Sequence, residues 1–337
     1  MLKNKNLYKK VFNELKKNNN FLIASHINPD GDSICSSMLM ATLLRDFDKR
    51  YHIIIEDPFP ERYRFILSHY YKVVVPELIN VPKGVDLLTQ LPEDYFPDVI
   101  LIIDSGGTDR LGDYSKYFKR AKKIINIDHH AGHLSFKALN LLDPDASSSG
   151  EILYDLMEAN HYKFGKDLAI LIYTAIVTDT RFFTQANTTS RTHYIVSRLI
   201  EKGVVPENIA YQLEQVPPDT LKVFGKVLTR SKTDFDGELI YSYITKPELK
   251  ACRSRDIDGL VELLRGTTET KVALLFKELD GKVKVSMRGK NHFNVFKMAR
   301  QFDGGGHIQA AGCTVDGNLS RVIKIVLDKF KIILKHG

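Results

Sequence analysis

The sequence contains no long hydrophobic run, and its first residues lack the apolar core of a signal peptide. No stretch approaches the roughly 18 consecutive apolar residues of a membrane-spanning helix, which argues against a membrane protein. Only three cysteines are present, Cys35, Cys252 and Cys313, and they lie far apart. This odd number and wide spacing exclude a disulfide framework and a zinc-ribbon pattern, so we expect reduced packing residues in a cytoplasmic protein.

The sequence also lacks internal repeats, low-complexity segments and the interleaved basic and aromatic residues of a long nucleic-acid-binding surface. Its 48 Lys and Arg exceed its 41 Asp and Glu, which gives a net charge of +7. Lysine-rich solvated helix faces explain most of this excess. The basic balance still favours an anionic ligand. We therefore expect a short phosphorylated ligand rather than duplex DNA.

The length and composition predict a soluble protein of two domains. The chain has 337 residues, of which 43% are hydrophobic and 26% charged. Apolar, strand-like runs at residues 21–25, 52–55, 99–103 and 123–127 alternate with helical patterns at 33–45, 149–159, 166–177 and 192–202. This alternation predicts an α/β domain with a parallel sheet and helices on both faces. Ligands bind such sheets outside the carboxyl ends of the strands.

The last third of the chain has a different pattern. Residues 204–218 are rich in proline and are interpreted as a linker between domains 1–203 and 219–337. Strands are predicted at 237–245 and 272–276, and a hairpin turn at 279–282 joins 272–278 to 283–288. Helices are predicted at 293–302 and 319–334. We expect a smaller α+β domain, with the active site in the cleft between the two domains.

Acidic and histidine residues follow four apolar stretches in the first domain. They are His26, Asp30 and Asp32, then Asp104, then Asp128, His129 and His130, and finally Asp179. A carboxylate at the end of a buried run is unfavourable unless a charge partner lies there. We interpret the four stretches as strand ends that converge on a divalent metal site.

The local spacing favours this interpretation over simpler ones. Asp30 and Asp32 are separated by a glycine, so one turn can direct both carboxylates into one crevice. His129 and His130 are adjacent, and in an extended chain they would point to opposite sides and have different roles. Taken alone, each aspartate could be a helix cap and His26 a core histidine. Their combination favours metal binding.

The ligand types indicate the class of metal. Oxygen and imidazole ligands without thiolate suit manganese or magnesium, with iron, cobalt or zinc as alternatives. A pair of such ions roughly 3.5–4 Å apart supports hydrolysis of phosphoesters or phosphoanhydrides. We therefore expect two divalent ions, manganese in the first place and magnesium or cobalt as alternatives.

These motifs, in this order, resemble those of the DHH phosphoesterases, a family named for the sequence that stands here as Asp128-His129-His130. The sequences 285–288, 304–307 and 310–312 are similar to the DHH-associated domain. The resemblance covers nearly the whole chain. It implies one ion held by His26, Asp30 and Asp104. It implies a second ion held by Asp32, Asp104, His129 and Asp179, with Asp104 as the bridge.

The resemblance also implies roles for residues that do not bind metal. Asp128 would orient a ligating imidazole, and His130 would face the substrate phosphate as a catalytic residue. Arg288 would bind a terminal phosphate in bidentate fashion. Substrate would also contact the backbone of Gly304, Gly305 and Gly306 and the side chain of His307.

The two-domain layout looks like the nanoRNase/pAp-phosphatase type. Those proteins hydrolyse very short RNA from an end and remove the 3′-phosphate of adenosine 3′,5′-bisphosphate. The alternatives are a cyclic di-AMP phosphodiesterase that forms pApA and AMP, and a non-catalytic nucleotide sensor. Arg181 and Asp303 stand where the family often has glycine, and Thr184 where it often has arginine. These departures leave the substrate open, and a homodimer is also left open.

Overall fold

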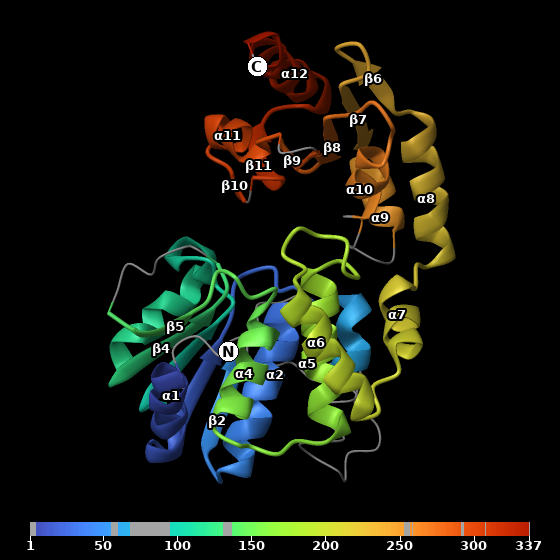
Figure 1. Ribbon diagram of the computed structural model, residues 1–337. Helices are drawn as coiled ribbons and strands as arrows, with labels where there is room; N and C mark the ends of the chain where they lie inside the picture. Colours follow the sequence, from blue (N-terminus) through green and yellow to red (C-terminus); the bar gives the residue numbers. More distant parts are fainter. Residues whose placement is uncertain are drawn as a thin grey trace. The chain divides into compact units, whose positions relative to one another are not determined.

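The computed structural model describes residues 5–54, 60–67, 95–130, 137–252, 257, 259–290, 293–306 and 308–336. The chain forms two compact units, Met1–Glu214 and Gln215–Gly337 (Figure 1). The segment predicted as a linker, 204–218, contains helix α7 (Pro206–Glu214) and the first residue of helix α8 (Pro218–Thr229).

A parallel five-stranded sheet organises the first unit. Its strands are β1 (Asn20–Ala24), β2 (Arg50–Ile54), β3 (Val99–Ile103), β4 (Lys123–Asp128) and β5 (Leu139–Leu142). Their order is β2-β1-β3-β4-β5, and all neighbouring pairs are parallel. The predicted strands are confirmed within the described residues, whereas β5 was not predicted. Because strand order reverses between β1 and β3, a ligand site is expected at their carboxyl ends.

Helices cover one face of this sheet. They are α1 (Lys5–Lys17), α2 (Gly31–Asp46), α4 (Ser149–Ala159), α5 (Lys166–Asp179) and α6 (Ser190–Glu201). In Figure 1, α2, α4 and α5 lie side by side, in agreement with their mutual contacts. The 3₁₀ segments η1 (Glu61–Tyr63) and η2 (Thr108–Arg120) also belong to the first unit, and η2 packs on the opposite face of the sheet. The parallel α/β prediction is therefore confirmed.

Successive side chains of the buried strands pack on opposite faces of the sheet. Leu101 and Ile103 of β3 belong to the large core beneath the helices. Ile100 and Ile102 belong to a second cluster on the opposite face, where they pack with Leu111 of η2. Strands buried on both faces read as continuous apolar runs, which is why β3 was recognisable in the sequence.

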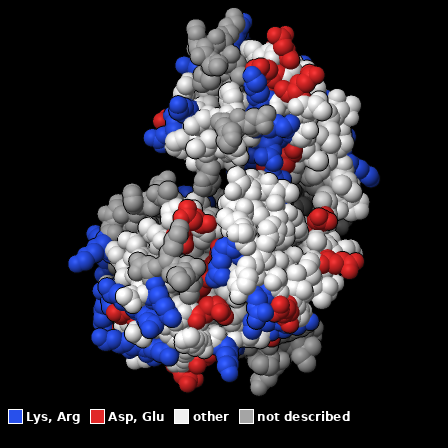
Figure 2. All heavy atoms as spheres, viewed as in Figure 1, with Lys and Arg blue, Asp and Glu red and all other residues white. Residues whose placement is uncertain are grey.

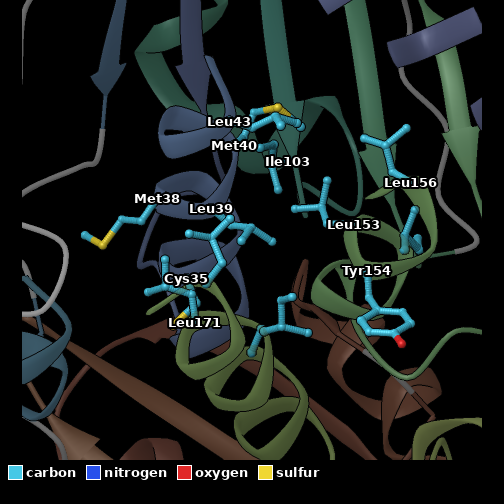
Figure 3. Close-up of a cluster of buried hydrophobic side chains, with 14 of the residues drawn as sticks. Cys35, Met38, Leu39, Met40, Leu43, Ile103, Leu153, Tyr154, Leu156 and Leu171 are labelled. Carbon is cyan, nitrogen blue, oxygen red and sulfur yellow. The ribbon is translucent and has the colours of Figure 1, made fainter. Parts of the chain in front are cut away.

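Buried side chains from three helices meet in the large core. Figure 3 shows Cys35 and Leu39 of α2 facing Leu153 of α4 and Leu171 of α5. Cys35, Cys252 and Cys313 are all free and buried, and each belongs to a hydrophobic cluster. The interpretation of the cysteines as packing residues is confirmed.

Two glycines allow helices α2 and α4 to approach α5 closely. A Cβ on Gly31 would lie 2.4 Å from Cγ2 of Thr178, and a Cβ on Gly150 would lie 2.5 Å from Cβ of Ala175. Both distances are far below van der Waals contact. Gly31 was expected to shape a turn, but here it serves the packing of two helices. These contacts bring the starts of α2 and α4 to the carboxyl end of α5.

The second unit is built on a mixed six-stranded sheet. Its order is β10-β11-β9-β8-β7-β6, and only the β7–β8 pair is parallel among the described pairs. The strands are β6 (Lys232–Asp234), β7 (Leu239–Ile244), β8 (Val272–Glu278), β9 (Lys282–Gly289), β10 (Gly305–Gly306) and β11 (Ala310–Asp316). The hairpin between β8 and β9 is confirmed, and β6, β10 and β11 were not predicted.

Short helices accompany this sheet. They are α8, α9 (Lys246–Ala251), α10 (Gly259–Arg265), α11 (Val295–Ala299), the 3₁₀ helix η3 (Arg300–Phe302) and α12 (Leu319–His336). The predicted helices correspond to α11 with η3 and to α12. The expectation of a smaller α+β domain is confirmed.

Basic and acidic side chains are mixed on the surface (Figure 2), as the similar numbers of the two kinds in the sequence lead one to expect. Figure 2 shows Lys and Arg on both units, interspersed with Asp and Glu. Within the described ranges, no helix combines the length and apolar character needed to cross a bilayer.

We predict that Gly150→Ala destabilises the protein by about 1–3 kcal/mol, because the added methyl group must displace Ala175 or shift α4. Urea unfolding midpoints would measure the change. Gly225→Ala in α8 is the control, since no atom of the described residues, apart from its chain neighbours and the backbone of its own helix, lies within 4 Å of the added Cβ. It should leave stability unchanged or raise it by up to about 1 kcal/mol. Equal midpoints for the two variants would refute the packing argument.

Candidate metal centre

His26 lies directly after β1 and is 3% exposed. Its Nδ1 lies 2.8 Å from the carbonyl oxygen of Ile27. In the neutral ring, Nδ1 then carries the proton and donates a hydrogen bond to this carbonyl. The other ring nitrogen, Nε2, is left with a lone pair. Nε2 is buried, and it lies 3.6 Å from Oδ2 of Asp30 and 3.7 Å from Oδ2 of Asp104. The ring is thus oriented as a metal ligand requires.

Asp30 has two functions at the start of α2. Its Oδ1 accepts a hydrogen bond from the backbone N–H of Ser33 at 3.0 Å, and the Ser33 hydroxyl lies 3.0 Å from the Asp30 backbone nitrogen. This capping box satisfies free backbone donors of the helix. The second oxygen, Oδ2, faces His26. Helix cap and candidate ligand therefore coexist in one carboxylate.

Asp32 is fully buried and is bound by the first residues of α4. Its Oδ2 accepts a hydrogen bond from the N–H of Ser149 at 2.6 Å, and its Oδ1 accepts one from the N–H of Gly150 at 3.0 Å. The hydroxyl of Ser36 donates to Oδ1 at 2.9 Å. The amino end of α4 favours negative charge at this position. The carboxylate is thereby fixed, with Oδ2 4.0 Å from Nε2 of His129.

Asp104 lies at the centre of the cluster. It follows β3 with a left-handed backbone (φ 56°), which aspartate tolerates better than most residues, and it is 1% exposed. Among the described residues, neither carboxylate oxygen has a hydrogen-bond partner. Imidazole nitrogens surround it: Oδ1 lies 3.4 Å from Nε2 of His129 and 3.3 Å from Nδ1 of His130.

Asp128 holds His130 in place. Its Oδ1 lies 2.8 Å from Nδ1 of His130 and also accepts the backbone N–H of His130 at 2.9 Å. Its Oδ2 accepts the N–H of Gly106 at 2.8 Å and faces the hydroxyl of Ser105 at 3.4 Å. The resemblance implied that Asp128 would orient a metal-ligating imidazole, whereas the imidazole that it binds is that of His130, the residue expected to face substrate.

His129 and His130 were predicted to point to opposite sides, as in an extended chain, and this prediction is wrong. Their ring centroids are only 4.4 Å apart, at an interplanar angle of 58°. The strand ends at Asp128, and the backbone bends at the two histidines, so the alternation of a strand no longer applies. Their contacts still differ, because Nε2 of His129 faces Asp179 at 3.2 Å.

Asp179 is the last residue of helix α5, so the interpretation of all four motifs as strand ends is wrong for this residue. The close packing of α5 against α2 and α4 brings its carboxylate to the sheet edge. Asn187 also holds this region, since its Nδ2 donates to the carbonyl oxygens of Ser147 (2.8 Å) and Asp179 (3.3 Å).

The electrostatics indicate an excess of negative charge. Burial raises the pKa of Asp179 to about 7, with Asp30 and Asp104 adding to the shift and His129 opposing it. Burial would lower the pKa of His130, but Asp104 and Asp128 outweigh it and raise the pKa to about 9. The pKa of Asp32 is also raised, by burial and by the carboxylates of Asp104 and Asp179. The raised pKa values of the carboxylates and of the imidazole both mean that these groups retain protons. A bound cation would supply positive charge in place of these protons.

Three overlapping groups in this cluster could hold a metal ion. They are His26, Asp30 and Asp104; Asp32, His129 and Asp179; and Asp104, His129 and His130. The buried atoms without a hydrogen-bond partner in the described chain include Nε2 of His26, both oxygens of Asp104 and Nε2 of His129. All are lone-pair donors suited to a divalent cation. The structure therefore brings together all six residues predicted as metal ligands, and their chemistry fits such an ion.

The residues predicted to bind substrate lie in the second unit. Arg288 of β9 donates from Nε to Oε1 of Glu262 at 2.6 Å, and Nη1 donates to the carbonyl oxygen of Met287 at 3.1 Å. His307 lies outside the described residues. Glu262 also binds Arg265, with Nε 3.0 Å from Oε2. This acidic partner of Arg288 was not predicted, because no local pattern marks it.

The glycine triplet has a packing explanation in part. Gly305 and Gly306 form β10, which pairs with β11. A Cβ on Gly304 would lie 2.3 Å from the carbonyl oxygen of Gly312, and Gly306 adopts φ 131°. Only Gly305 of the three has open space at its Cβ position. Close strand pairing thus requires glycine at two positions, whatever the triplet binds.

Two of the three departures from the family pattern lie in left-handed backbone. Arg181 and Asp303, which stand where glycine is common, have φ values of 47° and 55°. Phe182 and Phe183 are also left-handed, with φ values of 53° and 66°. Glycine adopts left-handed backbone most easily, so Arg181 and Asp303 occupy positions whose conformation would also suit glycine.

The donors that fix Asp32 were not predicted, although the sequence carries a signal for them. Ser147, Ser148 and Ser149 precede Gly150 at the start of a predicted helix, and Ser148 is its cap. Free N–H groups at a helix start bind anions, including carboxylates. Reading this segment as an anion-binding helix start would have linked it to one of the buried aspartates.

Comparison with known proteins identifies the family. The profile described as "DHH family, N-terminal domain" matches residues 20–176, and the profile described as "DHHA1 domain" matches residues 236–332. The chain belongs to the DHH family. In this DHH protein the first profile contains His26, Asp104 and His129, while Asp179 lies just beyond its end. The second contains Arg288 and the glycine triplet.

The DHH protein has relatives over nearly its full length. It is 29% identical to the bifunctional oligoribonuclease and PAP phosphatase NrnA of Thermus thermophilus over 309 residues, covering 91% of this chain and 87% of that protein. The protein of the same name from Bacillus subtilis is 24% identical over 300 residues, covering 87% of this chain and 88% of that protein.

Solved structures share the fold of the DHH protein. The crystal structure of an exopolyphosphatase-related protein from Bacteroides fragilis has a TM-score of 0.84 at 24% identity, covering 99% of this chain and 100% of that chain. Thermus thermophilus RecJ in complex with Mn²⁺ has a TM-score of 0.54 at 13% identity, covering 97% of this chain and 54% of that chain. At these identities the likeness concerns the fold alone.

We predict that the metal-free protein loses stability as pH rises from about 6 to about 9. The folded-state pKa values of Asp179 (about 7) and His130 (about 9) lie above their unfolded values. The native state therefore binds more protons, and its stabilisation is lost as pH rises through these values. We expect a decrease of about 1–3 kcal/mol in the free energy of unfolding, measured by urea denaturation in EDTA.

Two controls accompany this measurement. Magnesium should reduce or reverse the pH dependence, because a bound cation replaces the retained protons. His193→Gln removes an exposed imidazole outside the cluster and should leave the pH dependence unchanged. Stability in EDTA that stays constant or rises over this pH range would contradict the electrostatic argument.

Proposed function

We propose that this member of the DHH phosphoesterase family hydrolyses very short RNA from an end and removes the 3′-phosphate of adenosine 3′,5′-bisphosphate. As a member of that family it is a hydrolase that acts on phosphoester bonds. The observation that carries the proposal is the buried cluster in which Asp104 is shared between overlapping groups of metal-type ligands. The two relatives named as bifunctional oligoribonuclease and PAP phosphatase support the choice of substrate.

We propose that His26, Asp30 and Asp104, which form one group of the cluster, hold one divalent ion. The group of Asp32, His129 and Asp179 would hold a second, with Asp104 added as the bridge that the family resemblance implies. Manganese is the proposed ion because the donors are carboxylate oxygens and imidazoles without thiolate. The manganese-bound RecJ structure has the same fold, which is compatible with this choice. When bound, such ions supply Lewis-acid polarisation of a phosphoryl group and activation of water.

The protein's own side chains supply the remaining functions. Asp128 binds His130 through Nδ1 and thereby orients the ring, which we propose faces the substrate phosphate. With its pKa raised to about 9, His130 carries a proton at neutral pH in the metal-free protein. In this role it would stabilise negative charge on the phosphate or donate to the leaving oxygen.

Product analysis tests the proposal. The protein with manganese would be incubated separately with pApA, a 5′-phosphorylated RNA trimer, adenosine 3′,5′-bisphosphate and cyclic di-AMP. We expect stepwise release of mononucleotides from the linear RNAs and release of phosphate from the bisphosphate, with cyclic di-AMP unchanged. Folded Asp104→Ala is the inactive control, because it removes the ligand shared by both ions. Preferred opening of cyclic di-AMP would favour the phosphodiesterase, and no turnover at all would favour the nucleotide sensor.

We predict that Arg288→Ala raises KM by roughly 10- to 100-fold with little change in kcat, as expected when one charged hydrogen bond made equally in ground and transition states is lost. Steady-state kinetics with pApA would measure the effect. Arg265→Ala is the matched control, since it removes the other guanidinium bound to Glu262. Equal KM values for the two variants would show that Arg288 does not contact the phosphate.

A further inference from the structure

Arg110 is a half-buried cation without an acidic partner. It lies in η2, six residues after Asp104. Within the described ranges, its guanidinium makes no ion pair and no hydrogen bond. Two other arginines of the first unit are engaged: Arg191 pairs with Asp155, and Arg120 stacks on Phe96 and Tyr117. A desolvated guanidinium without a counter-charge is unfavourable unless an anion joins it.

The guanidinium lies beside His130. A Cβ placed on Gly106 would be 2.7 Å from Nη1 of Arg110 and 3.4 Å from both Cγ and Cδ2 of His130. The two side chains therefore meet at the Cα of Gly106, where any larger residue would displace Arg110. Gly106 itself donates its N–H to Asp128. The absence of a side chain at this position thus allows the guanidinium and the imidazole to lie together.

The backbone of Arg110 is held at the metal centre independently of its side chain. Its carbonyl oxygen accepts the N–H of Ile27 at 2.8 Å, next to His26. The segment that carries the guanidinium is therefore anchored beside His26 by a backbone hydrogen bond.

The chemistry of this position indicates an anionic ligand. The cluster offers lone pairs for cations, whereas Arg110 offers only N–H donors in a planar fork that fits two oxygens of one phosphate. We propose that Arg110, side by side with His130, binds the non-bridging oxygens of the phosphate that undergoes hydrolysis. This inference rests on the proposed function, and it adds a substrate-binding residue of the first unit to those predicted in the second.

Kinetics of three variants test the inference. Arg110→Ala should lower kcat/KM for pApA and for adenosine 3′,5′-bisphosphate roughly 10- to 100-fold, as expected for loss of a hydrogen bond between charged groups. Arg110→Lys should be intermediate, because it keeps the charge but not the fork. Lys119→Ala removes an exposed charge from the same segment and should remain within about twofold of the parent. Guanidinium ion should partly restore Arg110→Ala.

A binding measurement separates this inference from the proposed function. Inorganic phosphate would be titrated calorimetrically into the magnesium-loaded parent, Arg110→Ala and Lys119→Ala proteins. We expect about tenfold weaker binding for Arg110→Ala alone. If the parent protein hydrolyses none of the substrates, the proposed function fails, but this titration still decides the role of Arg110.

Several results would overturn the role of Arg110. They are equal phosphate affinity of Arg110→Ala and Lys119→Ala, equal kcat/KM of these variants in an active protein, and no phosphate binding by the parent. A loss of activity that guanidinium does not restore, together with a lower unfolding midpoint, would instead assign Arg110 a structural role.

Discussion

The carboxylate of Asp104 is the constraint around which the first unit is arranged. It is buried at the end of a central strand, and its oxygens are surrounded by imidazole nitrogens rather than by hydrogen-bond donors of the backbone. Such a group is stable only where positive charge is close. Parallel strands provide this closeness, because the residues after β1, β3 and β4 all lie at one edge of the sheet. The imidazoles supply part of the charge, and a divalent ion would supply the remainder.

Helix packing brings further side chains to the cluster at the edge of the sheet. The starts of α2 and α4 bring Asp30 and the donors for Asp32 to the same edge, and the end of α5 brings Asp179. These helices come close only because glycine stands at their contacts with α5. The cluster is therefore a product of both electrostatics and shape. A carboxylate that is already fixed by backbone N–H groups needs little rearrangement when it binds an ion, which is how preorganisation favours binding.

Much of this arrangement could be predicted from the sequence, and the exceptions share a physical reason. Strands β1, β3 and β4 were predicted because they are buried on both faces and read as apolar runs. Asp179 was placed at a strand end because apolar residues precede it, although those residues belong to a buried helix. The orientation of His129 and His130 was wrong because the chain bends where the strand ends. Arg110 gave no signal, since its surroundings are formed by Gly106 and His130, which only the fold brings together.

Asp32 has two functions and the side chain of Arg110 has one, so substitutions at the two positions would have different consequences. The Asp32 carboxylate supports the start of α4 as well as the cluster, so a substitution there would be exposed to selection on folding and on chemistry at once. Arg110 holds its loop through the backbone carbonyl, which any residue provides. A substitution of its side chain would therefore affect phosphate binding while leaving in place the backbone contact that holds the loop.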